Sequence, residues 1–381
     1  MVWREVSVED QRREFVMLAS CEGANVAELC RRFGISRQTG YRWRARFAAG
    51  DASFGDRSRR PHHSPGRLPA ELEARILTLR DTHPAWGARK LAALIRRDGI
   101  VPPAVSSVHQ VLLRHGRIAA DAAGRAHCRF EHERPNALWQ MDFKGRVRLA
   151  DGSWLHPLTV IDDHSRYAVV LAACSDERTA TVREHLERAL RRHGLPDAIY
   201  VDNGSPWGGG VPGQWTPLRV WLAKLGVALI HSRPYHPQGR GKNERFHRSL
   251  KAEVLDRHIF RDLAHAQGAF DAWRRLYNTG RPHQALDFAV PAERYRPAHR
   301  AFPKILAPMV YAEGEVLRRV GTTKSYVSFR NRLWRVPDAF AGEILAIRPR
   351  RPEGRFVICF GTHEIAAIDL TKPAPATAGN V

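Results

Sequence analysis

The spacing of apolar residues changes near Leu138, and this change limits what the chain can fold into. Upstream, apolar residues recur every three or four positions, which is typical of amphipathic helices. Downstream, they alternate with other residues over short runs, which indicates strands, and helical spacing then returns between the later strands. A helical N-terminal region followed by a strand-containing region predicts a multidomain protein of the α+β class.

Residues 7–48 predict three short helices, because side chains that cap helices stand where each helical run begins. These caps are Ser7 with Asp10, Asn25 with Glu28, and Ser36. A helix, a turn containing Gly34 and a helix rich in arginine form the pattern of a helix-turn-helix, whose second helix lies in the major groove of DNA. We therefore assign residues 1–50 to a DNA-binding domain, with a small helical hairpin that has a solvated basic face as the alternative. The candidate DNA contacts are Ser36, Arg37, Gln38, Thr39, Tyr41, Arg42 and Arg44.

The next two segments predict a linker and a second helical domain. Residues 51–67 are rich in Gly, Ser, Pro and Arg, with little apolar periodicity, and are expected to form a basic linker. Residues 68–130 predict a second helix-turn-helix domain. Its helix at 106–115, expected to be capped by Ser106 or Ser107, occupies the reading position.

Residues 131–300 predict a mixed sheet covered by helices. Three antiparallel strands come first, and helices then alternate with two further strands. The expected strands are 139–147, 155–162, 167–172, 198–201 and 227–230, and the expected helices are 177–193, 218–225, 240–256 and 262–277. Six short strand signals between 309 and 370 predict a small C-terminal β-barrel-like domain or a sandwich. We expect residues 371–381 to form a disordered tail.

Basic residues exceed acidic ones in every one of these regions. The chain has 61 Lys and Arg against 39 Asp and Glu, and a formal net charge of +22. This distribution favours a long polyanion that touches several domains, although an arginine bias without function is the alternative. The longest apolar run, residues 167–174, is too short to cross a bilayer, so we expect a cytoplasmic protein with no membrane partner. Five scattered cysteines indicate neither a disulfide framework nor a zinc site.

Three acidic residues stand out against this basic background. Asp142 lies in the first expected strand of the sheet, Asp202 follows the strand 198–201, and Glu244 lies in a basic helix. Ligand sites form at strand ends in such sheets, and a helix can bring a third carboxylate across them. Carboxylate oxygens select Mg²⁺ or Mn²⁺, and two such ions can support cleavage or transesterification of a phosphodiester. A simple turn role is the alternative for Asp202, which precedes Asn-Gly.

The helical spacing around Glu244 supports its inclusion. The buried stripe is expected to consist of Phe246, Leu250 and Val254, four residues apart. The other face is expected to present Arg240, Glu244, His247, Arg248 and Lys251. Glu244 would then project from a basic surface that meets a phosphate backbone.

From Asn136 to about Pro297 the chain resembles the integrase core of DDE transposases, the RNase H-like catalytic domain shared by retroviral integrases and bacterial insertion-sequence transposases. The matching stretches are LWQMDFKG, DDHSRY, VDNGSPW, HSRPYHPQGRGKNERFHRSLK and YNTGRPHQALDFAVPAERY. The resemblance implies that Asp142, Asp202 and Glu244 form the catalytic and metal-binding triad and use two Mg²⁺ or Mn²⁺ ions. It also implies cleavage that frees a 3′-hydroxyl at an insertion-sequence end, followed by strand transfer into target DNA.

The resemblance further implies the partners of the chain. These are double-stranded DNA, both terminal inverted repeats and target, and further copies of the chain in a homodimer or higher oligomer, within the nucleoid. The implied contacts with DNA ends are Lys242, Asn243, His247, Arg248 and Lys251, whereas Asp162 and Asp163 resemble structural positions. The chain departs from the family in one respect, because the 41 residues between Asp202 and Glu244 exceed the usual spacing. The extra length falls in a loop rich in Gly and Pro, where insertion is tolerated.

Two other functions compete with this interpretation. A tyrosine recombinase would match only through His258 and Arg261 followed by Tyr277 or Tyr295, a pattern that occurs often by chance. A non-catalytic DNA-binding regulator, or a domesticated transposase, would share the helix-turn-helix domains. The intact set of three acids argues against that second alternative.

Overall fold

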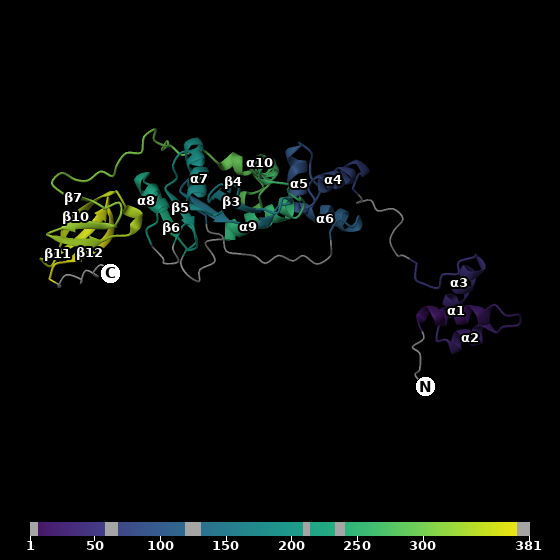
Figure 1. Ribbon diagram of the computed structural model, residues 1–381. Helices are drawn as coiled ribbons and strands as arrows, with labels where there is room; N and C mark the ends of the chain where they lie inside the picture. Colours follow the sequence, from purple (N-terminus) through teal and green to yellow (C-terminus); the bar gives the residue numbers. More distant parts are fainter. Residues whose placement is uncertain (1–6, 58–67, 119–130, 209–213, 233–240, 372–381) are drawn as a thin grey trace. The chain divides into compact units, whose positions relative to one another are not determined.

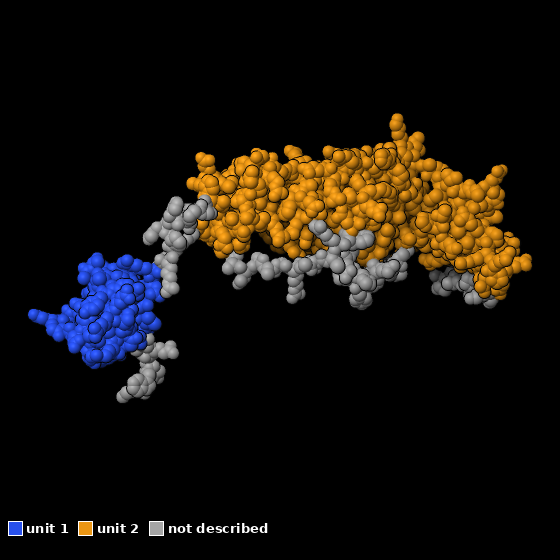
Figure 2. Space-filling model, turned by 180° about the vertical axis from the view of Figure 1, so that it is seen from behind, with its two compact units in different colours: residues 1–67 blue, residues 68–381 orange. Residues whose placement is uncertain are grey.

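The computed structural model describes residues 7–57, 68–118, 131–208, 214–232 and 241–371. The chain divides into two compact units, residues 1–67 and residues 68–381, which Figure 2 shows in blue and orange. The expected tail lies outside the described residues except for its first residue. Within the described residues, the helices are too short or too polar for any of them to span a membrane.

The described residues of the first unit, 7–57, form three helices, as the capping residues predicted. They are α1 (Val8–Ala19), α2 (Val26–Arg32) and α3 (Arg37–Ala48). The side chains of Ser7, Asn25 and Ser36 each accept a backbone N–H from three residues ahead at 3.1 Å, so all three predicted caps are confirmed. The helices enclose a small core that includes Phe15 and Trp43.

A second set of three helices opens the other unit. These are α4 (Ala70–Thr82), α5 (Ala88–Arg97) and α6 (Val105–Arg114), packed around Ile76, Leu91 and Val108. The expected cap at Ser106 or Ser107 is wrong, because α6 begins at Val105 and no side chain caps it. The helices also pack on the domain that follows, since Leu276 joins their core and Arg97 pairs with Glu293 at 3.0 Å.

A mixed sheet of six strands forms the centre of this unit (Figure 1). Its strands are β1 (Leu138–Phe143), β2 (Val147–Arg148), β3 (Trp154–Asp162), β4 (Ala168–Cys174), β5 (Ala198–Val201) and β6 (Ala228–His231). β3 pairs antiparallel with β1, β2 and β4, whereas β1, β5 and β6 run parallel. The prediction that three antiparallel strands come first and two further strands follow is confirmed. The expected strand 139–147, however, is broken. Gly145 interrupts it with a φ of 83°.

Helices cover both faces of the sheet. α7 (Thr179–His193) and α8 (Pro217–Lys224) pack on one face through a core that includes Leu186 and Trp221. α9 (Gly241–Leu250), its π-helical continuation η2 (Lys251–Leu255) and α10 (Leu263–Thr279) pack on the other. That second core includes Phe246 and Phe270. A short 3₁₀ helix, η3 (Gln284–Leu286), and α11 (Pro291–Arg294) end this domain.

The C-terminal strands form an open sheet rather than the expected β-barrel. They are β7 (Val316–Arg319), β8 (Tyr326–Phe329), β9 (Arg332–Arg335), β10 (Ile344–Arg350), β11 (Arg355–Phe360) and β12 (His363–Asp369). Four of them form an antiparallel sheet in the order β12-β11-β10-β7, while β8 and β9 form a separate hairpin. β7 and β12 are therefore edges, and a barrel would require them to be joined through paired strands. Strand periodicity alone does not show which strands pair.

Candidate active site

Two of the three predicted acids lie at the ends of neighbouring parallel strands. Leu138 pairs with Ala198 and Gln140 pairs with Tyr200, so β1 and β5 run side by side in this register. The same register extended by two residues places Asp142 opposite Asp202. Adjacent strands lie about 4.8 Å apart, so the backbones of the two aspartates are neighbours. This is the edge of a mixed sheet at which ligand sites form.

The turn after β5 holds Asp202 through its backbone and its side chain. The carbonyl of Asp202 accepts the Nδ1–H of His231 at 2.9 Å, which connects the turn to the end of β6. Its carboxylate accepts the backbone N–H of Gly204 at 2.9 Å. This bond with Gly204 is the turn contact expected if Asp202 has a simple turn role. It also orients the carboxylate at the end of the strand. A Cβ at position 204 would lie 3.2 Å from Asp202 Oδ1, so glycine leaves the carboxylate room.

A buried histidine of α9 lies beside Asp142. Thr159 is paired with Asp142 across β1 and β3, and its hydroxyl donates to the Asp142 carbonyl at 2.9 Å. The same hydroxyl lies 2.8 Å from His247 Nε2, so the ring donates its Nε2–H to Thr159. His247 Nδ1 then faces the Asp142 carboxylate at 4.0 Å. Burial, together with the charge of Lys144, lowers the pKa of His247 to about 4, so this approach is not an ion pair at neutral pH.

Glu244 lies one turn before His247 in α9, with its side chain exposed. Among the residues that the structure describes, no three His, Cys, Asp or Glu side chains are gathered closely enough to hold a metal ion. The fold thus brings Asp142 and Asp202 together and places the helix that carries Glu244 beside Asp142, but Glu244 points to solvent. Asp142 and Asp202 offer carboxylate oxygens, a type of donor that suits a hard divalent cation.

The expected basic face of α9 is only partly present. Arg248 and Lys251 are exposed, as predicted. His247 is instead buried, because it lies against Thr159 of β3 and Asp142 of β1 on the side of the helix that α10 does not cover. Asn243, the implied contact with a DNA end, is buried as well. The sequence pattern missed this second buried side, since a histidine and an asparagine give no apolar signal. It also gave no sign that Thr159 and His231 support the two aspartates.

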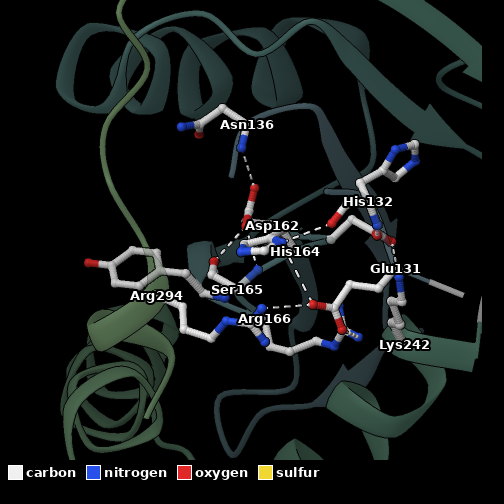
Figure 3. Close-up of polar contacts among 11 residues, drawn as sticks. Glu131, His132, Asn136, Asp162, His164, Ser165, Arg166, Lys242 and Arg294 are labelled. Atoms are coloured by element: carbon white, nitrogen blue, oxygen red, sulfur yellow. Dashed lines mark hydrogen bonds and ion pairs between the residues drawn. The ribbon is translucent and has the colours of Figure 1, made fainter. Parts of the chain in front are cut away.

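Lys242 belongs to a buried network of polar side chains around the turn after β3, shown in Figure 3. Its ammonium lies 2.5 Å from Asp163, which also accepts the side-chain N–H of Gln140 at 2.7 Å and the backbone N–H of His132 at 3.0 Å. Burial lowers the pKa of Lys242, while Asp163 opposes this shift. Lys242 therefore neutralises a buried carboxylate rather than presenting a free charge at the surface.

Asp162, the other acid of this turn, is fully buried. It accepts the backbone N–H of Asn136 at 2.7 Å and of Ser165 at 2.8 Å, and the Ser165 hydroxyl at 2.5 Å. Burial raises the pKa of Asp162. Both turn aspartates thus tie the segment before β1 to the turn between β3 and β4, which confirms the structural role expected for them.

The candidate DNA contacts of α3 fall into two groups. Arg37, Gln38, Tyr41 and Arg42 are exposed and lie on one side of the helix, at positions that follow its turns. Ser36 and Thr39 hydrogen-bond to each other at 2.9 Å at the start of the helix, and Arg44 is half-buried. The first group presents two guanidinium groups, an amide and a phenol to solvent, a set able to contact phosphates and base edges.

Family models match nearly every described part of the chain. Residues 132–237 and 225–291 match the integrase core domain. Residues 316–375 match the C-terminal domain of the IS481 family of transposases. In front of the core, residues 11–62 match a helix-turn-helix domain and residues 39–112 match a homeodomain-like domain.

Proteins of two bacterial insertion elements are similar to this chain over most of their own length. The uncharacterized 31.7 kDa protein of IS407 from Burkholderia multivorans is 31% identical over 240 residues, which cover 60% of this chain and 82% of that protein. The uncharacterized 39.2 kDa protein of IS476 from Xanthomonas euvesicatoria is 30% identical over 256 residues, 63% of this chain and 71% of that protein. Among solved structures, the HTLV-2 integrase catalytic core domain in complex with magnesium is 15% identical and covers 42% of this chain and 97% of that chain, with a TM-score of 0.32.

Proposed function

This chain belongs to the transposases of bacterial insertion elements that carry an integrase core, and from that premise we propose that it cuts and joins DNA ends at Asp142, Asp202 and Glu244. The reaction would free a 3′-hydroxyl at each terminal inverted repeat and transfer it to target DNA. The observation that carries this proposal is the parallel pairing of β1 and β5, which makes Asp142 and Asp202 neighbours at one sheet edge.

The three carboxylates would hold two Mg²⁺ or Mn²⁺ ions. When bound, such a pair of ions supplies positive charge at the attacking and leaving oxygens of an in-line phosphoryl displacement. Asp142 is held by β1 and by the hydroxyl of Thr159 on its backbone, and Asp202 is oriented by Gly204. The Glu244 side chain is exposed and would rotate toward the two aspartates.

The DNA would be gripped by surfaces on both units. We propose that Arg37, Gln38, Tyr41 and Arg42 of α3 contact the inverted repeat. Arg248 of α9 and Lys251, the first residue of η2, would contact the phosphates next to the cleavage site. All six side chains are exposed, and the arginines carry the charge that phosphate binding needs. Lys251 pairs with Asp256 at 2.5 Å and would exchange that partner for a phosphate. We further propose that two DNA ends are paired by at least two copies of the chain.

The test is cleavage of a labelled duplex that carries an inverted repeat from beside the gene, with and without Mg²⁺. Asp142→Asn and Glu244→Gln should abolish cleavage and strand transfer while end binding persists, because each removes one anionic ligand. Glu184→Gln, at an exposed position on α7, is the matched control and should cut like the wild-type protein. Equal loss of DNA binding in both site variants would refute the assigned roles, and binding by a wild-type protein that never cleaves would indicate a regulator instead.

A further inference from the structure

A cavity of about 240 Å³ lies where the second helical set meets the end of the core domain. One wall is α5, which contributes Arg89, Ala92, Ala93 and Arg96. The other wall includes Val105 at the start of α6 and Phe288, which follows η3. Elements from a DNA-reading fold and from the catalytic domain therefore share this cavity.

The α5 wall is a single helical stripe. Its four residues are spaced i, i+3, i+4 and i+7 along the helix, so their side chains share one face. Ala92 and Ala93 are buried and form a small apolar floor. Arg89 and Arg96 are exposed, two turns apart, or about 10 Å along the axis, at either end of this floor.

The two arginines of the cavity carry unbalanced charge. Neither forms an ion pair with any carboxylate of the described residues, whereas the next residue, Arg97, pairs with Glu293 at 3.0 Å. None of the described residues that line the cavity is acidic. Such a site favours an anionic occupant, and the planar guanidinium suits phosphate oxygens in particular.

Phe288, the aromatic residue that lines the cavity, lies in an unusual turn. Asp287 and Phe288 have φ values of 51° and 65°, a left-handed conformation that residues with side chains rarely adopt. The turn is closed by the Phe288 N–H donating to His283 O at 2.9 Å and by the His283 N–H donating to Ala289 O at 3.1 Å. The result is a half-buried ring beside two arginines, and strained backbone of this kind concentrates at binding sites.

We propose that this cavity holds a phosphodiester of duplex DNA, with Arg89 and Arg96 on the phosphate oxygens and Phe288 against the adjoining sugar. The volume is smaller than the roughly 300 Å³ at which pockets begin to enclose a whole ligand, and it suits one segment of a backbone that continues past the protein. In a helix-turn-helix the helix before the reading helix crosses the DNA backbone, and α5 holds that position relative to α6. This inference rests on the proposed DNA function. It adds that the core domain and the second helical set together hold one phosphate.

The experiment measures binding of the full-length protein to a random-sequence duplex by fluorescence anisotropy over a series of KCl concentrations. Loss of two phosphate contacts lowers the slope of log K against log [salt] by about 1.8 and, at 0.1 M salt, weakens binding by about 60-fold. We expect Arg89→Gln with Arg96→Gln to approach these values. The matched control is Arg75→Gln with Arg97→Gln, which removes the same charge from arginines paired with Asp98 and Glu293. The control should change the slope by less than half as much.

Phe288→Leu keeps an apolar side chain on the turn and gives a second readout. It should weaken binding several-fold at every salt concentration without changing the slope, because no charge is lost. Arg96→Glu should weaken binding more than Arg96→Gln if a phosphate sits at this position.

Several outcomes would overturn the inference. Equal slopes for the two double variants would show that the cavity touches no phosphate. The Arg89→Gln, Arg96→Gln variant could instead differ from the wild-type protein in mass, measured by light scattering without DNA, while its DNA binding stays intact. That result would show that a second copy of the chain occupies the cavity. Failure of the proposed chemistry is separable, because Asp142→Asn retains full salt dependence whichever result the cavity variants give.

Discussion

Replacing Gly204 with alanine tests the position of Asp202 without removing any charge. A Cβ at residue 204 would lie 3.2 Å from Oδ1 and 3.4 Å from Oδ2 of the Asp202 carboxylate. Normal contact between carbon and oxygen is nearer 3.5 Å, so the carboxylate must move by a few tenths of an ångström. The backbone N–H of residue 204 remains able to donate to Oδ1, and the turn itself should therefore persist.

The expected loss follows from the size of this displacement. A misplacement of about 1 Å can lower the rate about 100-fold. If the logarithm of the rate falls in proportion to the displacement, a shift of about 0.25 Å lowers the rate about 3-fold. A β-branched residue crowds both oxygens more, so Gly204→Val should lose about 10-fold or more. DNA binding should stay at the wild-type level, because no phosphate-binding group has changed.

The assay is single-turnover cleavage of a labelled inverted-repeat duplex with saturating protein, together with anisotropy for binding. Gly268→Ala is the matched control, since a Cβ there meets nothing within 4 Å in α10. The control should cleave normally and gain about 1 kcal/mol of stability from helix propensity. Wild-type cleavage by Gly204→Val would refute the role given to Asp202, and so would parallel losses of binding and cleavage.

Two further predictions concern packing and pH. Gly40→Ala should lower the stability of the first unit by about 1–2 kcal/mol, because its Cβ would lie 2.6 Å from Cys30 Sγ and 2.9 Å from Phe15 Cζ; a lower melting temperature with weaker end binding checks this, and an unchanged melt contradicts it. Burial, helped by the charges of Arg192 and Arg274, lowers the pKa of His193 from 6.5 to about 4. The unfolded chain thus binds the proton more readily between these values, so stability present above pH 6.5 is lost as the pH falls, by about 2 kcal/mol between pH 7 and pH 5. Urea unfolding should show this loss in the wild-type protein and much less of it in His193→Phe, and equal losses in both would assign the effect to other groups.

The helices of the first unit show how far local sequence reaches. Ser7, Asn25 and Ser36 were recognisable as caps because a cap bonds to a backbone N–H only three residues away. Such a contact depends on no other part of the fold. The same approach was wrong for α6, where the chain enters the helix at Val105 without a side-chain cap.

The break in the first strand shows where local sequence stops. Residues 139–147 look like one strand, but the left-handed Gly145 inserts an extra residue opposite β3, as in a bulge. Beyond it Arg148 pairs with Trp154 across the strands, and its guanidinium lies 4.8 Å from the Trp154 ring. Because strand side chains alternate, one extra residue exchanges the faces of all that follow, and the pairing partner alone reveals it.

The sequence by itself determined most of the helices and strands, because helical and strand periodicity and caps depend on neighbouring residues. It also supplied Asp142, Asp202, Glu244 and the basic residues of α3 as predicted site residues. Only the tertiary structure decided that β1 and β5 are parallel neighbours, that His247 is buried against Thr159, and that Lys242 neutralises Asp163. It also decided that the C-terminal strands stay open. Each of these depends on segments distant in sequence, whose pairing is selected by how the whole chain buries its apolar surface.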